Sequence, residues 1–476
     1  MSSLKIGMVG FDITPQFHPT CGAWGCTPTM TELDMPLLAR CIALDQGGRR
    51  LLWFGSDLVG ETVKGTNGFR DEIAGALGLR REQVVWSTSQ THSSGAVPGS
   101  LLTGSSICDL SKQDPAFMAA ERKRFMTSYL EAGRQAIERL QPARVWAGRG
   151  FCDSMSYNTR FRMPTGGVKF SRHHSEGLQS GKFFDPSIGL VRFDSADGKP
   201  LGAIFNFCAH PATMINNTMI SPDWVGTARA CIEEAIGGAP AMYGQGFCGD
   251  VNCHHIFGTP AQARRTGARL GKAAVEALST LVPVRGEPLW SEFKTIELQC
   301  QPMPARAEFE RQLAARRAFV DELRDDPTAT WFCGINAPDQ FNPEQKTAFV
   351  EVQMKYLREG IRMLDAGESP RTSLPVTLGA VRIGDVAAVL SPGENFTETG
   401  REIRTRSPFA HTLICGDTNG LFGYIGTDEE IDRGGYETDS FWKMLYFDGF
   451  RLPLAKGTAE RIIRCGLELL QQLSRN

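Results

Sequence analysis

The sequence predicts one large α/β domain in which mixed sheets are flanked by helices. Three observations carry this prediction: apolar segments paired around turns, helical segments that begin at capping residues, and the lack of any repeat, low-complexity block or Pro/Ser-rich linker in 476 residues. The hydrophobic fraction of 41% and the charged fraction of 22% are ordinary for a globular protein. A chain of this length can bury a large core without disulfide bonds.

Strands are predicted first as hairpins, because turn residues join two apolar segments. Three such pairs occur: residues 41–45 with 49–57, 188–194 with 201–211, and 376–384 with 385–393. Two further apolar segments, 83–88 and 411–415, have the length of fully buried strands. Together with the helices between them, these strands argue for mixed sheets.

Helices are predicted from their capping residues. The expected starts are Asp114 before a proline, Thr259 before a proline, with a helix running to Ser279, and Asp223, with a helix running to Glu234. The chain ends with an amphipathic helix from Thr458 to Leu473.

Residues 304–326 and 343–367 form two long, highly charged helical patterns. We interpret them as a helical hairpin inserted at about 304–367. This hairpin either packs on the body of the domain as a solvated element or acts as a lid or an oligomer contact. The sequence leaves that choice open, and with it the question of a homo-oligomer.

Charge, hydropathy and cysteine usage exclude several partners. The net charge of -2 offers no broad basic surface for nucleic acid or for an anionic membrane. No apolar run is long enough for a signal peptide or a membrane-spanning helix, so we expect a cytoplasmic protein without membrane insertion. The 13 cysteines contain no CxxC pair and are interpreted as reduced thiols, with a Cys21–Cys26 disulfide as the disfavoured alternative.

Several familiar catalytic signatures are absent. The sequence has no HExxH and no GxSxG motif, and segments 177–182 and 267–272 each fall short of a P-loop. These absences exclude the usual zincin, serine hydrolase and nucleotide-binding predictions and leave a small-molecule substrate as the expected partner.

Two histidines follow predicted strands. His92 comes after the apolar strand 83–88 among small polar residues, and His210 comes after 201–208 and before a proline. The ends of strands and the loops after them are favoured positions for functional side chains in α/β folds. We therefore expect the two imidazoles to meet; the alternatives are a hydrogen-bonded loop histidine and a capped core histidine.

Acidic residues occupy comparable positions. Glu394 follows a buried strand and Ser-Pro-Gly, where a helix is predicted to begin, and Asp250 lies at a glycine-flanked strand end. Acidic residues are also common in the first turn of a helix, which is the plain alternative for Glu394. A Cys/His metal site at His254 and His255 is disfavoured, because adjacent imidazoles point to different sides. His173 and His174 lie in a long polar loop and are expected to be solvated or to close over a substrate.

Seven motifs, taken together and in the order in which they occur along the chain, resemble the catalytic domain of the neutral/alkaline, non-lysosomal ceramidase family. They are FDITP (11–15), LARCIALD (38–45), THS (91–93), NFCAHPATM (206–214), GDVN (249–252), SPGE (391–394) and NGLFGYIGTDEEIDRGGYE (419–437). The resemblance covers about residues 5 to 470. It implies that residues 1–476 form the catalytic N-terminal domain only, without the family's C-terminal β-sandwich-like module.

The resemblance also implies the roles of several residues. The family holds zinc with two histidines, a glutamate and a tyrosine, which match His92 or Gln90, His210, Glu394 and Tyr424. A second tyrosine faces the substrate and matches Tyr436. A substrate-facing arginine matches Arg160, with Arg162 as a rival. Asp250 is expected to be catalytic by orienting His210.

Two departures from the family pattern bear on the metal. Where the family usually has His-Thr-His, this chain has Gln90-Thr91-His92. If the chain is extended there, positions 90 and 92 point the same way, so His92 replaces the missing ligand or Gln90 binds weakly through its amide oxygen. Asn252 replaces a serine of the family and is a further substrate-binding or weak ligand residue. The cofactor is expected to be Zn²⁺, with another divalent cation as the alternative.

The resemblance implies a zinc-dependent hydrolase of an amide (N-acyl) bond, in which hydroxide formed at the metal attacks the carbonyl. Two alternatives remain. One is a cytoplasmic hydrolase of a small polar amide, lactone or glycoside-like substrate, suggested by the polar loop at 163–184. The other is a metal-free binding protein on the same scaffold, suggested by the loss of one imidazole.

Overall fold

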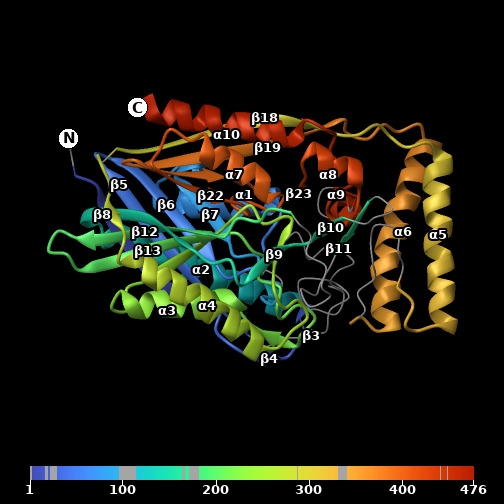
Figure 1. Ribbon diagram of the computed structural model, residues 1–476, viewed down its shortest axis with the longest axis horizontal. Coiled ribbons are helices and arrows are strands. Elements are labelled where there is room, and N and C mark those ends of the chain that lie inside the picture. The colour runs from blue at the N-terminus through green and yellow to red at the C-terminus, as the bar shows by residue number, and fades with distance from the viewer. Residues whose placement is uncertain are drawn as a thin grey trace.

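The computed structural model describes residues 3–16, 20–21, 29–95, 114–162, 167–170, 182–286, 288–330, 340–439, 441–446 and 449–475. In this part of the chain two sheets share a core, and helices cover both outer faces (Figure 1). Both sheets contain parallel and antiparallel neighbours, which confirms the predicted α/β class with mixed sheets.

The larger sheet contains nine described strands. Its order is β15 (Ala241–Gln245), β13 (Pro200–Phe207), β12 (Ser187–Ser195), β8 (Gln141–Phe151), β1 (Lys5–Asp12), β5 (Leu38–Gln46), β6 (Arg49–Ser56) and β7 (Val84–Thr88), and β17 (Val282–Pro283) pairs with β8. The β5–β6 and β12–β13 hairpins are those predicted from the sequence. The pairs β6–β7 and β13–β15 are parallel.

The smaller sheet has the order β18 (Leu289–Gln299), β19 (Ser373–Ile383), β20 (Val386–Leu390) and β22 (His411–Cys415). The predicted third hairpin is β19–β20, and β20 and β22 are parallel. Side chains from both sheets, such as Trp53, Phe193 and Leu413, form one buried cluster between them. Burial on both faces explains why β20 and β22 are continuously apolar.

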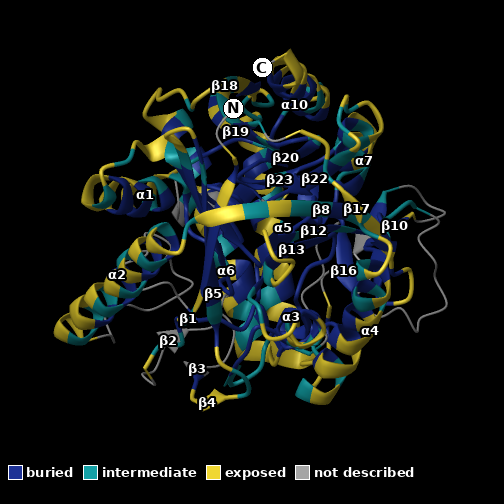
Figure 2. Cartoon of the chain, turned by 90° about the vertical axis from the view of Figure 1, so that its left-hand side faces the viewer, coloured by how far each residue is buried: buried dark blue, intermediate teal, exposed yellow. Residues whose placement is uncertain are grey.

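Helices cover the outer faces of the two sheets. On the larger sheet lie α1 (Val63–Leu77), α2 (Pro115–Glu138), α3 (Trp224–Ala235) and α4 (Pro260–Leu278), and on the smaller sheet lie α7 (Thr397–Thr405) and α10 (Thr458–Arg475). The predicted caps are present: Asp114 accepts from Ala116 N, and Thr259 forms a capping box with Gln262. Figure 2 shows most strands buried, with β8 as an exception that has exposed and intermediate residues, and the outer faces of these helices exposed.

The two predicted charged helices are α5 (Arg306–Asp325) and α6 (Pro343–Asp365), which lie side by side at one end of the molecule (Figure 1). Their apolar faces, with Phe309 and Phe349, pack against Tyr436 and Trp442. These two aromatic residues belong to α9 (Tyr436–Asp439) and η5 (Phe441–Tyr446), which follow α8 (Asp428–Arg433). The hairpin is thus in contact with a segment that carries a predicted site residue.

Among the described residues, five short strand pairs lie outside the two large sheets. They are β21 (Gly393–Asn395) with β23 (Gly423–Ile425), β16 (Val251–Cys253) with β9 (Ser156–Asn158), β10 (Arg160–Arg162) with β11 (Val168–Phe170), β14 (Met219–Ile220) with β4 (Glu32–Leu33), and β2 (Thr20–Cys21) with β3 (Thr29–Met30). The turn η1 (Arg81–Gln83) precedes β7. The prediction that a helix begins at Glu394 is wrong. Glu394 lies in β21 opposite Tyr424, and α7 begins at Thr397.

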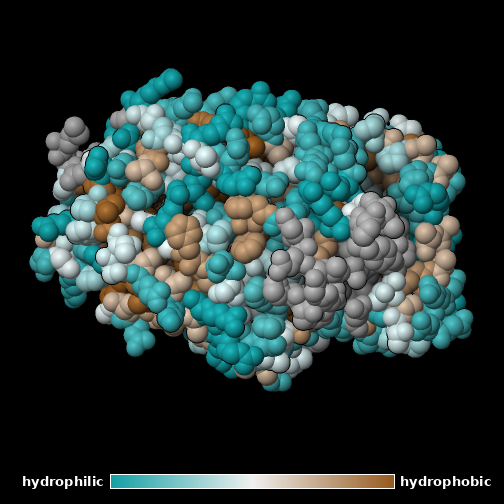
Figure 3. Space-filling model, in the orientation of Figure 1, coloured by the Kyte–Doolittle hydropathy of each residue, from teal (hydrophilic) through white to brown (hydrophobic). Residues whose placement is uncertain are grey.

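On the face seen in Figure 3, apolar side chains are scattered among hydrophilic ones. None of the described helices combines the length and the apolar character needed to cross a membrane. Cys26, His173, His174 and most of the polar loop 163–184 lie outside the described residues.

Candidate functional site

Most of the predicted site residues lie just after the carboxyl ends of strands. The parallel strands β13 and β15 lead to His210 and Asp250, and the parallel strand β20 leads to Glu394. The end of β7 joins this edge, because His92 N donates to Pro211 O at 3.1 Å. Strands from both sheets therefore deliver their polar residues to one place.

Glycines allow these loops to approach closely. A Cβ on Gly249 would lie 2.2 Å from Glu394 O. A Cβ on Gly416 would lie 2.8 Å from Gly246 O and 3.3 Å from Gly393 O. Any larger residue at position 249 would push away the backbone that carries Glu394.

The contact between His210 and Glu394 is the centre of the site. His210 Nε2 lies 3.2 Å from Glu394 Oε2, and His210 Nδ1 lies 3.0 Å from Val251 O. Because a carbonyl oxygen can only accept, we assign the proton of a neutral ring to Nδ1. Nε2 then turns a lone pair toward a carboxylate oxygen, and a proton or a cation between these acceptors would satisfy both.

Three more rings surround this pair. The ring of His210 has its centroid 5.9 Å from that of His92 and 6.4 Å from that of Tyr424. The Tyr424 ring lies 5.8 Å from the Tyr436 ring. Burial and the charge of Glu394 raise the pKa of the Tyr424 phenol well above its usual value. The structure thus brings together His92, His210, Glu394 and Tyr424, with Tyr436 beside them.

The side chains of His92, His210, Glu394 and Tyr424 are chemically suited to bind a divalent metal. Imidazole nitrogen and carboxylate oxygen are ordinary zinc ligands, and here His210 Nε2 and Glu394 Oε2 face each other at 3.2 Å. Within the described residues, no group of three or more His, Cys, Asp and Glu side chains is already placed to hold a metal ion. The direct His210–Glu394 contact occupies the space in which a shared ion would lie.

Gln90 does not follow the geometry assumed from the sequence. The expectation that positions 90 and 92 point the same way required an extended chain, but β7 ends at Thr88 and Gln90 has a φ of 63°. The Gln90 side chain is buried, and its Oε1 accepts from Cys248 Sγ at 3.5 Å. Asn252 lies in β16 and forms a backbone bridge with His210.

Asp250 is fully buried beneath the site. Its Oδ1 accepts from Thr397 N at 2.7 Å, and its Oδ2 accepts from Asn158 Nδ2 at 2.7 Å. The expected contact with His210 is made instead by the neighbouring Val251 carbonyl. Burial, partly offset by these hydrogen bonds, raises the pKa of Asp250 to about 7.

The raised pKa of Asp250 predicts a pH-dependent stability. Folded protein binds a proton that the unfolded chain releases between a pH of about 4 and about 7. The free energy of unfolding is therefore expected to fall as pH rises through this window, by up to about 1.4 kcal/mol per pH unit, and to level off above it. In urea unfolding at several pH values, Asp250→Asn should show a shallower fall than the unsubstituted protein. Equal slopes would contradict the assignment.

Arg160 lies in a buried ion network. Its Nη1 donates to Glu437 Oε2 at 2.6 Å, its Nη2 to Gly434 O at 2.6 Å, and its Nε to Glu430 Oε2. Lys182 Nζ reaches the other oxygen of Glu430 at 2.5 Å. The guanidinium thus ties β10 to α8 and α9, and its role toward a substrate stays a prediction. Arg162, the rival, is largely exposed and pairs with Glu429.

Sequence reasoning missed Asp417, which follows β22. Its side chain is 2% exposed, and neither carboxylate oxygen has a hydrogen-bond partner. Burial and the charge of Glu394 raise its pKa well above the usual value. The available signal was its position: an acidic residue two places after the buried apolar strand HTLIC, as Asp250 and Glu394 follow theirs.

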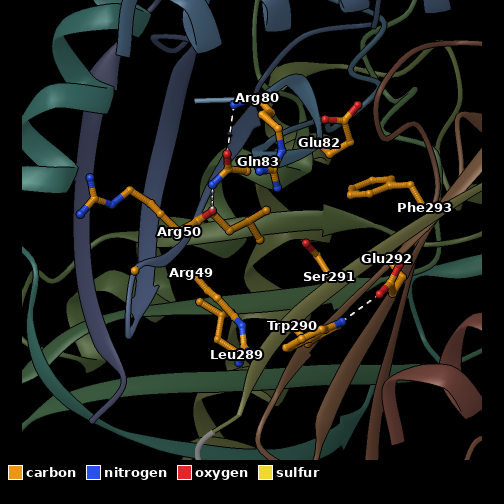
Figure 4. A pocket seen from close by; sticks show the side chains of 12 residues that line it. Arg49, Arg50, Arg80, Glu82, Gln83, Leu289, Trp290, Ser291, Glu292 and Phe293 are labelled. Atoms are coloured by element: carbon orange, nitrogen blue, oxygen red, sulfur yellow. Dashed lines mark hydrogen bonds between the residues drawn. The ribbon is translucent and has the colours of Figure 1, made fainter. Parts of the chain in front are cut away.

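His254 and His255 contact other residues than those of the candidate site. The His254 ring lies 6.1 Å from that of Tyr157, and His255 Nδ1 lies 3.4 Å from Gln262 Nε2. A separate cavity of about 540 Å³ opens at the amino end of β7 (Figure 4). The residues of η1, the β5–β6 turn and β18 line it, among them Arg80 and Trp290, and the described lining includes no histidine, cysteine or tyrosine. This cavity is therefore not part of the candidate site.

The fold and the clustered side chains define a mixed α/β protein with a histidine–carboxylate–phenol site at a sheet edge. Neutral ceramidase from Pseudomonas aeruginosa has a similar structure, with a TM-score of 0.67 and 20% sequence identity over 100% of this chain and 75% of that chain. A structure of ceramidase complexed with C2 gives a TM-score of 0.69 and 20% identity, covering 100% and 76%. The chain therefore has the fold of these ceramidases. No family model matches the sequence, and no curated protein matches it.

Proposed function

We propose that this protein is a metal-dependent hydrolase of an amide bond, with zinc as the expected metal and an N-acyl compound as the substrate. The observation that carries the proposal is the buried contact between His210 Nε2 and Glu394 Oε2 at 3.2 Å, with His92 and Tyr424 around it. The likeness of the chain in fold to ceramidases supports an amide bond as the bond that is cleaved. Membership of that family and a cytoplasmic location remain predictions.

A divalent metal at this site would acidify a water molecule and polarise the amide carbonyl. The chain itself supplies the surroundings. Val251 O fixes the tautomer of His210, so that Nε2 keeps its lone pair available to a cation. Tyr436, whose ring lies 5.8 Å from that of Tyr424, would donate from its phenol to the carbonyl oxygen as charge develops there. Such a preorganised donor typically contributes on the order of 3 kcal/mol to the transition state.

The test combines metal content with substrate choice. Elemental analysis of the purified protein should find about one divalent metal ion per chain, and a chelator should remove both metal and activity. Turnover should be higher for an N-acyl sphingoid base than for short polar N-acyl amides. If the protein prefers the short polar amides, the proposed amide-bond hydrolysis would stand, but the proposed substrate would have to change from an N-acyl sphingoid base to a small polar amide. Protein that binds no divalent cation would refute the proposed function.

A further inference from the structure

Asp417 is a buried acid whose carboxyl oxygens have no hydrogen-bond partner in the described structure. It is 2% exposed, and neither Oδ1 nor Oδ2 accepts a hydrogen bond. Leaving a buried carboxylate without a donor or a cation is costly, so such groups are normally paired or bound to a metal. Other buried aspartates of this chain follow that rule. Asp57 pairs with Arg229 at 2.7 Å, and Asp223 accepts from Met214 N and Trp224 N.

The backbone holds Asp417 at the same sheet edge as Glu394. Asp417 follows β22 as Glu394 follows β20, and these strands are parallel neighbours. Ser391 N donates to Cys415 O at 2.9 Å and Thr418 N donates to Ser391 O at 3.0 Å, so the two loops run together on both sides of Asp417. The residue holds a φ of 45°, which an aspartate tolerates but most side chains do not.

Asp417 interacts electrostatically with two other buried groups, Glu394 and Cys248. Among the charged groups acting on the buried Cys248 thiol, Asp417 has the largest effect, and Glu394 also contributes. Cys248 Sγ in turn donates to Gln90 Oε1 at 3.5 Å. Asp417 and Glu394 thus act on the same buried group, as expected for carboxylates that follow neighbouring parallel strands. Within the described residues, neither oxygen of Asp417 accepts a hydrogen bond.

We propose that Asp417 is a ligand of the metal ion that His210 and Glu394 hold, an assignment that rests on the proposed function. A carboxylate that no side chain satisfies is suited to accept a divalent cation, and a small movement of Glu394 away from His210 would open the space between them. With the imidazole of His210 and the two carboxylates, the ion would have three protein ligands of ordinary zinc chemistry before Tyr424 or His92 is counted. Because Asp417 follows β22 as Glu394 follows β20, the smaller sheet would contribute two ligands.

Asp417→Asn tests this assignment, because asparagine also tolerates a positive φ. In chelator competition at fixed pH, we expect the zinc Kd of the variant to rise by at least about tenfold. In metal-free protein near neutral pH, the same variant should unfold at a higher temperature than the unsubstituted chain, since it removes the cost of protonating a buried acid whose pKa is raised. With cobalt in place of zinc, its visible absorption spectrum should change. Asp223→Asn is the matched control: it should lower the unfolding temperature with and without metal and leave zinc affinity and the cobalt spectrum as they are.

The outcomes separate the two proposals. An Asp417→Asn variant with unchanged zinc affinity and cobalt spectrum overturns the ligand assignment and leaves the proposed function standing, as would be expected if a water molecule satisfied the carboxylate. Should Asp417→Asn fail to fold, Asp417→Gly gives the same comparison, because glycine adopts a φ of 45° without strain. An unsubstituted protein that binds neither zinc nor cobalt refutes both proposals.

Discussion

Glu394→Ala is expected to lose the bound metal and the hydrolytic activity together. The variant removes the carboxylate whose Oε2 lies 3.2 Å from His210 Nε2, so a shared ion would lose one ligand and part of its charge compensation. Metal catalysis supplies several kcal/mol of transition-state stabilisation, so kcat/KM should fall by at least about 10³-fold. Elemental analysis and steady-state kinetics on the same preparation check both effects.

A matched control separates this loss from general damage. Glu402 lies on α7, directly after the site, and its half-exposed carboxylate pairs with Arg406 at 3.1 Å. Glu402→Ala should therefore keep its metal and its activity. Retention of about one metal ion per chain by Glu394→Ala would mean that the His210–Glu394 contact is an ordinary hydrogen bond, and the proposed site would have to be abandoned.

Local sequence patterns predicted most of the fold because they depend on few neighbours. The β5–β6 hairpin follows from two apolar segments around Gly47 and Gly48, both of which have positive φ in the structure. The α4 helix begins at Pro260 because Thr259, as the N-cap residue, forms a capping box with Gln262. The strand β18 was missed because its exposed positions outnumber its buried ones, so no continuous apolar pattern marks it.

The site was harder to predict, because side-chain directions at strand ends depend on tertiary packing. Gln90 and Asp417 both have a positive φ. The expectation that side chains two positions apart point the same way holds only for an extended chain, so it gave a wrong direction for Gln90 and no direction for Asp417. Glu394 lies in a short strand because Tyr424 offers a backbone partner thirty residues later, which local helix rules do not include. The spacing of residues along the chain indicated which polar side chains follow buried strands. It could not indicate which of them lack a partner.

Arg160→Met is expected to destabilise the protein by about 3–5 kcal/mol, the usual cost of breaking a buried ion pair. The guanidinium is fully buried and contacts both Glu430 and Glu437, so its removal leaves two buried carboxylates with less compensation. Urea unfolding measures the change. Arg162→Met is the matched control two residues away, and it should cost far less because its pair with Glu429 is largely exposed.

The same network allows a structural role of Arg160 to be separated from contact with a substrate. Glu430 and Glu437 flank Tyr436, so loss of Arg160 is expected to displace that phenol and lower activity even if the guanidinium never touches substrate. Combining Arg160→Met with Glu430→Gln and Glu437→Gln removes the unbalanced charges, which should recover most of the lost stability. If activity returns with stability, Arg160 positions Tyr436. If stability returns and activity does not, the guanidinium itself binds the substrate, as the resemblance of the sequence implies.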